Sequence, residues 1–251
     1  MRCRLVGSEM CIRDRFIVGP EQAFPLSTEE IEATAKEDLK KMQSDLMQHA
    51  IGDVAINIKI EHGFPPDVIA EYSLEEKCAL IVMGTKGAKG LKKMLLGSMS
   101  SQVMKKVEIP LILIPEAYQT HQIKNILFAT NFLLYDEVFA KELMALAKLF
   151  EAKLYCMHLS NEKQLANDQK NMDDLKDELL ANKFGVDVVF DVIVSPERDT
   201  EAAIDEYMAN HEIDLLAIHT LHRINLLHQL DHPSIARKFA LDLELPLLVF
   251  S

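Results

Sequence analysis

The stretch from Met83 to Pro115, MGTKGAKGLKKMLLGSMSSQVMKKVEIPLILIP, decides the fold of this chain. A short apolar run at 79–83 leads into its glycines, and a run of this length predicts a buried strand. After the glycines, residues 98–107 have a helical pattern, and 111–114 form a second apolar run behind a proline. A strand, a glycine-rich loop, a helix and a strand in this order predict a parallel βαβ unit.

The loop inside this stretch contains residue types that bind phosphate. Gly84, Gly87 and Gly97 let the backbone approach a ligand closely, because glycine adopts positive φ without strain. Ser98 opens the helix, where free N–H groups and the positive end of the dipole attract anions. Lysines at 86, 89, 92 and 93 add positive charge. A phosphate site is one interpretation, and a loop whose glycines only turn the chain is the other. The spacing fits neither a Walker A loop nor the dinucleotide fingerprint.

Outside the loop, helical periods alternate with short apolar runs, which is typical of an α/β protein with parallel strands. We expect helices at 28–50, 66–77, 98–107, 135–151, 161–184, 199–211 and 233–243. We expect strands at 54–60, 79–83, 111–114, 123–130, 153–159, 187–194, 214–219 and 246–250. The polar connector at 116–123 is the candidate domain boundary.

The chain contains an internal duplication. A shift of 135 residues places Ile69, Glu71 and Tyr72 on Ile204, Glu206 and Tyr207. A shift of 136 places Ser98 on Ser234 and Pro110 on Pro246, so the second loop is longer by one residue. The first-half counterpart of the strand at 126–131 would fall before Met1. We therefore expect a first repeat at 16–118 without its opening strand and a complete second repeat at 123–251.

The first fifteen residues, MRCRLVGSEMCIRDR, are similar to the translation of a sequencing adapter. We expect residues 1–15 to be a non-native segment that takes no part in the fold.

The spacing Gly-x2-Gly-x9-Gly-Ser, from Gly84 to Ser98, resembles the ATP-binding motif of the universal stress protein family. The sequence ILFATN at 126–131 looks like the first strand of that family, and His158 looks like the histidine that ends its second strand. The resemblance covers residues 16–251. It implies two tandem open parallel five-stranded sheets with helices on both faces, the first sheet lacking its first strand. It also implies that the final strands, 111–114 and 247–250, pair or pack as a pseudo-dimer within the chain.

By the same resemblance, Gly84, Gly87, Gly97 and Ser98 would cradle the ribose and phosphates of ATP or AMP, with or without Mg²⁺. The implied function is that of a stress-response regulator or adaptor whose protein partners are unknown, with a homodimer as one further assembly. One alternative is a protein-interaction module that binds no nucleotide, and a second is a weak ATPase. We identify no catalytic residue and no metal ligand set, so an enzyme is not the expectation.

The second repeat departs from the motif. Gly84 and Gly87 correspond to His219 and His222, and Gly97 corresponds to Pro233. Imidazoles and a proline do not offer the close, flexible backbone that a phosphate needs. Asn131 stands where ATP-binding members of the family have an aspartate. We therefore expect no ATP in the second domain.

Composition and charge exclude other classes. A formal charge of −12 disfavours a nucleic-acid groove, which needs a basic face. No apolar run reaches the ~18 residues of a membrane span. The four cysteines form no Cys-x-x-Cys pair, which favours reduced thiols in a cytoplasmic protein. His219, His222, His228 and His232 could in principle ligate zinc, but a degenerate loop that tolerates polar residues is the simpler interpretation.

Overall fold

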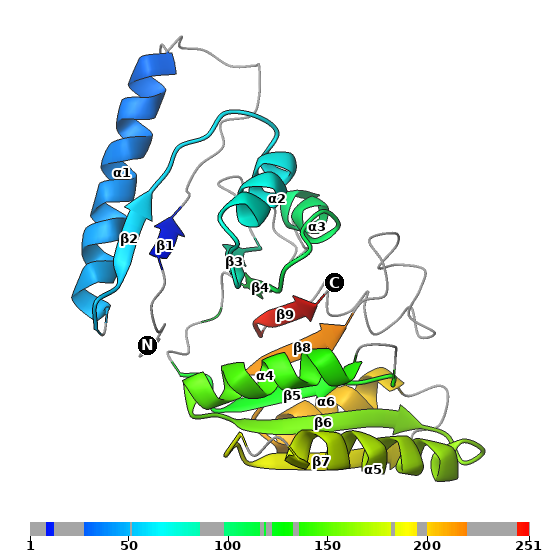
Figure 1. The fold of residues 1–251 in the computed structure, drawn as a ribbon. Helices are drawn as coiled ribbons and strands as arrows, with labels where there is room; N and C mark the ends of the chain where they lie inside the picture. The colour runs from blue at the N-terminus through cyan, green and yellow to red at the C-terminus, as the bar shows by residue number, and fades with distance from the viewer. Residues whose placement is uncertain are drawn as a thin grey trace. The chain divides into compact units, whose positions relative to one another are not determined.

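The computed structural model describes residues 9–12, 28–50, 52–85, 98–115, 118, 122–132, 136–181, 184–194, 200–219 and 245–250. They divide into two compact units, one ending at Val68 and the other starting at Ile69 (Figure 1). In the described ranges, no helix combines the length and the apolar character needed to cross a lipid bilayer.

The first unit contains strand β1 (Glu9–Ile12), helix α1 (Thr28–His49) and strand β2 (Ala55–Ile58). β1 and β2 pair in parallel. Leu39 of α1 and Ile56 of β2 form a small core, 1% and 3% exposed. β1 lies inside the segment 1–15, so four of these residues take part in a sheet. The adapter-like origin of the segment stays a prediction.

The second unit contains one seven-stranded sheet with the order β3-β4-β9-β8-β5-β6-β7 (Figure 1). Its strands are β3 (Ile81–Gly84), β4 (Leu111–Ile114), β5 (Asn125–Ala129), β6 (Lys153–Ser160), β7 (Val188–Val194), β8 (Leu215–His219) and β9 (Leu247–Phe250). The described helices here are the later turns of α2 (Pro65–Glu75), then α3 (Ser98–Met104), α4 (Asp136–Phe150), α5 (Leu165–Ala181) and α6 (Thr200–Asn210). The predicted helix at 233–243 lies outside the described residues.

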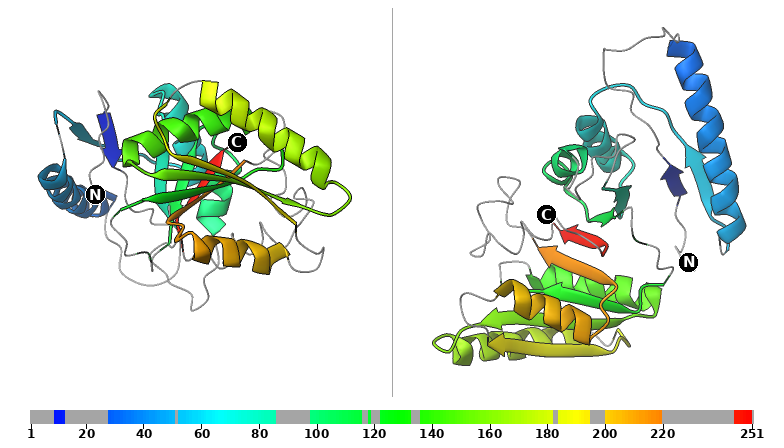
Figure 2. Two further views of the ribbon diagram at one scale, coloured as in Figure 1. Left: turned by 90° about the horizontal axis from the view of Figure 1, so that it is seen from below. Right: turned by 180° about the vertical axis from the view of Figure 1, so that it is seen from behind.

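Helices cover both faces of the second-repeat strands, as predicted (Figure 2). α4 and α5 contribute Leu143 and Leu175 to a core with Phe128 on one face. α6 contributes Ile204 to a second core with Leu127 on the other face. Phe128 and Leu127 are neighbours on β5 and point to opposite faces, because successive strand residues alternate. β5 is therefore buried on both faces, which explains its continuous apolar sequence.

The final strands of the two predicted repeats, β4 and β9, form an antiparallel pair. Leu111 of β4 lies opposite Val249 of β9, and Leu113 lies opposite Leu247. The predicted pairing of the two final strands is thus confirmed. Its consequence is one shared sheet in place of the two separate sheets that the sequence suggested. All other neighbouring strands in this sheet run parallel.

The first repeat is divided between two sheets for a topological reason. In the second repeat, β5 pairs with both β6 and β8 and so joins them. Among the described residues, β1 pairs in parallel with β2, as β5 does with β6, but the first repeat has no strand that joins β2 to β3. Its strand β2 therefore belongs to the two-stranded sheet, while β3 and β4 belong to the large one.

Cys156 allows a test of the core that contains it. Its thiol is completely buried, and burial raises its pKa because a thiolate is poorly solvated there. Above pH ~8.5 the unfolded chain loses this proton while the folded chain keeps it, so stability falls as the pH rises. We expect a decrease of about 1.4 kcal/mol per pH unit from this group between about pH 9 and 11. Urea unfolding of Cys156→Ala should show a shallower slope against pH, and equal slopes would contradict the burial.

Candidate functional site

The glycine-rich loop leaves the sheet at the carboxyl end of β3. Gly84 is the last residue of that strand, and the next residue, Thr85, donates its N–H to the carbonyl of Ile114 at 3.0 Å. In open α/β sheets, ligands bind outside the carboxyl ends of the strands. The loop therefore begins where a ligand site is expected.

Ser100 ties the helix behind the loop to the strand in front of it. Its hydroxyl lies 3.3 Å from the carbonyl of Gly84 and 3.4 Å from that of Thr85, and the residue is 2% exposed. Ser98 opens α3 two residues earlier. Both ends of the loop thus lie at the same edge of the sheet. Of the predicted site residues, Gly84 ends β3 and the backbone of Ser98 begins α3. Gly87, Gly97 and the Ser98 side chain lie outside the described residues.

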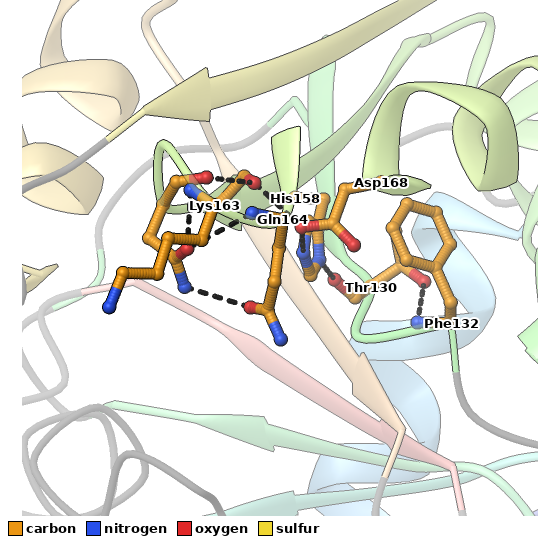
Figure 3. A network of polar contacts seen from close by, with 8 residues as sticks. Thr130, Phe132, His158, Lys163, Gln164 and Asp168 are labelled. Carbon is orange, nitrogen blue, oxygen red and sulfur yellow. Dashed lines mark hydrogen bonds and ion pairs between the residues drawn. The ribbon is translucent and has the colours of Figure 1, made fainter. Parts of the chain in front are cut away.

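The corresponding edge of the second repeat carries a polar network, part of which Figure 3 shows. β5, β6 and β8 are neighbours and run parallel, so their carboxyl ends meet. His158 lies near the end of β6, His219 ends β8, and Thr130 follows β5. Each histidine faces an aspartate from the first turn of a helix.

The first pair joins His219 to α4. Nδ1 of His219 lies 2.5 Å from Oδ1 of Asp136, and both side chains are 5% exposed. The hydroxyl of Thr130 donates to the other carboxylate oxygen at 2.5 Å and accepts the N–H of Phe132 at 3.0 Å. The carboxylate is therefore oriented by two donors, one from the end of β8 and one from the residue after β5.

The second pair joins His158 to α5 (Figure 3). Its Nδ1 lies 2.8 Å from the carbonyl of Thr130, and its Nε2 lies 3.3 Å from Oδ2 of Asp168. The hydroxyl of Ser160 donates to the same carboxylate oxygen at 2.6 Å. Both ring nitrogens of His158 thus face oxygen acceptors of the protein.

The turn after β5 is strained. Phe132 has a φ of 55°, which a bulky residue adopts rarely and at a cost of about 1–3 kcal/mol. Its ring lies 4.4 Å from that of His158, and its N–H is bonded to Thr130. These contacts hold the turn in place. The neighbouring Asn131 is exposed. In the universal stress protein family, which the sequence resembles, ATP-binding members have an aspartate at this position.

The arrangement provides no nucleophile activated by a base. The Ser160 hydroxyl donates to Asp168 and not to a histidine, so the three residues do not form a Ser-His-Asp triad. Within the described ranges, no group of three histidine, cysteine, aspartate or glutamate residues could hold a metal ion. His222, His228 and His232 lie outside them.

The two aspartates were not identified from the sequence, although a signal for them existed. Asp136 is buried in register with Ala140, Leu143 and Ala147 on the apolar face of α4. Asp168 is likewise buried in register with Met172, Leu175 and Leu179 on α5. An acidic residue in the first turn is usually read as compensation for the helix dipole. Its position on the apolar face indicates a buried partner instead.

The sequence profile of the universal stress protein family matches residues 11–115. This segment of the chain, residues 11–115, belongs to the universal stress protein family. A universal stress protein from Methanocaldococcus jannaschii is 34% identical over 94 residues, which are 38% of this chain and 54% of that protein. The chain thus spans about half the length of this curated relative.

Solved structures agree with this assignment at the level of the fold. The crystal structure of a universal stress protein from Archaeoglobus fulgidus has a TM-score of 0.64 at 17% identity, covering 89% of this chain and 80% of that one. A protein of unknown function from Pseudomonas aeruginosa PAO1 has a TM-score of 0.56 at 16% identity, covering 96% and 92% of the two chains. The family profile includes the whole loop from Gly84 to Ser98.

Proposed function

We propose that this universal stress protein binds an adenine nucleotide, ATP or AMP, through Gly84, Gly87, Gly97 and Ser98 of its first repeat. The observation that carries the proposal is the Ser100 hydroxyl, which bonds the carbonyls of Gly84 and Thr85. This contact holds the start of α3 beside the carboxyl end of β3, so the first N–H groups of the helix lie at the end of the sheet where ligands bind. The lysines of the loop supply charge for phosphates, with Mg²⁺ as a further counter-ion.

The second repeat binds no nucleotide in this proposal. A buried imidazole, His219, takes the place of Gly84, and the exposed Asn131 takes the place of the family aspartate. The chain would consist of a nucleotide-binding domain at 16–118 and a partner domain at 123–251, joined as a pseudo-dimer through β4 and β9. Its role would be to alter contacts with other proteins under stress. A cytoplasmic location is part of the proposal, supported by the reduced, buried thiol of Cys156.

The experiment is a thermal-shift titration of the whole chain with ATP and Mg²⁺. At a hundred times the dissociation constant, ATP should stabilise the chain by about 2.7 kcal/mol and raise Tm by roughly 5–10 °C. Gly97→Val should abolish the shift, because its side chain blocks the approach of a phosphate.

The repeat offers a matched control for this titration. Pro233→Val alters the position that corresponds to Gly97 in the second repeat and should leave the ATP shift unchanged. The absence of any shift in the unaltered chain would favour a protein-interaction module. Phosphate release above background that disappears in Gly97→Val would indicate a weak ATPase.

A further inference from the structure

The second repeat ends a strand with an imidazole where the first repeat ends one with glycine. His219 corresponds to Gly84 at the shift of 135 residues, and each is the last residue of its strand. β8 is the neighbour of β5, and the strand order of the second repeat reverses between these two strands. In open α/β sheets, ligands bind outside the carboxyl ends of the strands at this point. The His219 ring therefore lies where a ligand would be expected.

The His219 ring is held on its edge by Asp136. A carboxylate only accepts hydrogen bonds, so Nδ1 of His219 carries the proton in their 2.5 Å contact. Thr130 donates to the other oxygen of Asp136 and so fixes the direction of the carboxylate. With both side chains of the pair 5% exposed, solvent does not compete for this hydrogen bond.

A phenyl ring also packs against the His219 ring, at a tilt of 53°. The centroid of Phe139 lies 4.2 Å from that of His219, and Phe139 packs in turn on Phe250 at 5.0 Å. Phe139 comes from α4, one turn after Asp136, so one helix supplies both the acceptor and the aromatic wall. An oriented acceptor beside an aromatic surface recognises a planar ring that has an N–H donor.

We propose that Asp136, Thr130 and Phe139 form a binding site for a planar heteroaromatic N–H ring of the imidazole class, and that His219 fills it as a covalently attached occupant. The inference goes beyond nucleotide binding by the first repeat and does not depend on it. It accounts for an acidic residue on the apolar face of α4, since Asp136 is the acceptor that the occupant needs. While His219 is in place, the site is closed to an external ligand.

The test is complementation of full-length His219→Gly by free imidazole. Removal of the ring leaves the Asp136 carboxylate without one of its donors, so Tm should fall. At about pH 8.5, where imidazole is largely neutral, it should donate its N–H to Asp136. We expect Tm to rise by about 3 °C or more at ten times its dissociation constant. 1-Methylimidazole has nearly the same shape but no N–H donor when neutral, and should produce no rise.

His211→Gly is the matched control, because the His211 ring also packs against aromatic rings, those of Tyr155 and Tyr207. Imidazole should leave its Tm unchanged. The proposal would be overturned if imidazole and 1-methylimidazole raised the Tm of His219→Gly equally. It would also be overturned if imidazole raised the Tm of His219→Gly and His211→Gly equally. If His219→Gly does not fold alone, it is refolded from urea with each compound: recovery of the native near-ultraviolet spectrum only with imidazole supports the site, and failure with both contradicts it.

Discussion

Leu113→Asp is expected to lower the free energy of unfolding by more than about 4 kcal/mol. Leu113 is completely buried in β4, between β3 and β9, and its side chain packs in the core formed with α3 and α6. The substitution would place a carboxylate without a partner at the junction of the two repeats. The loss should therefore affect the whole second unit and not one edge of it.

Urea denaturation followed by circular dichroism measures this loss, and Val82→Asp is the control. Val82 lies on the neighbouring strand β3 and is 61% exposed. An aspartate there stays hydrated, so we expect a change within about 0.5 kcal/mol. Comparable losses in the two variants would show that β4 is not an interior strand of the sheet.

Asp136→Ala should cost about 3 kcal/mol, because it leaves the buried donors of His219 and Thr130 without their acceptor. Asp136→Asn retains an acceptor oxygen and should cost clearly less. The measurement is again urea denaturation, at a pH where the unaltered chain is folded. A change below about 0.5 kcal/mol for Asp136→Ala would contradict the network.

A double-mutant cycle separates this pair from general packing. Asp136→Ala combined with His219→Ala should show a coupling free energy of about 1–3 kcal/mol, since the two groups are in direct contact and buried. The exposed ion pair of Lys153 and Asp187, at 3.2 Å, is the comparison and should give less than about 1 kcal/mol. Similar coupling in the two pairs would mean that burial adds nothing to the Asp136 contact.

Local patterns predicted most of the helices and strands. The helix expected at 28–50 is found at Thr28–His49, and the strand at 111–114 is found unchanged as β4. The helix expected from 161 begins as α5 at Leu165. Asn161 still caps it, because its side-chain oxygen accepts the N–H groups of Lys163 and Gln164 at 3.0 and 3.1 Å. The sequence pattern does not distinguish the short turn at 162–164 from the helix that follows it.

Long-range features were harder to predict, since they depend on which strands become neighbours. The β4–β9 pair followed from family resemblance and not from residue pattern. The division of the first repeat between two sheets reflects a difference in pairing: β5 pairs with both β6 and β8, whereas β1 pairs with β2 alone. The pairing of Asp136 with His219 joins residues 83 positions apart. Periodicity locates the aspartate on the helix but does not name its partner.

The β4–β9 pair also sets an order of events during synthesis. From Leu113 to its partner Leu247 the ribosome adds about 130 residues. At ~5–20 residues per second, this takes roughly 7–26 s. For that time the nascent chain presents the apolar β4 with an unpaired edge, which is a template for association with other chains. Chaperone demand should therefore be greatest while the second repeat is being translated, and should end only when the last strand emerges.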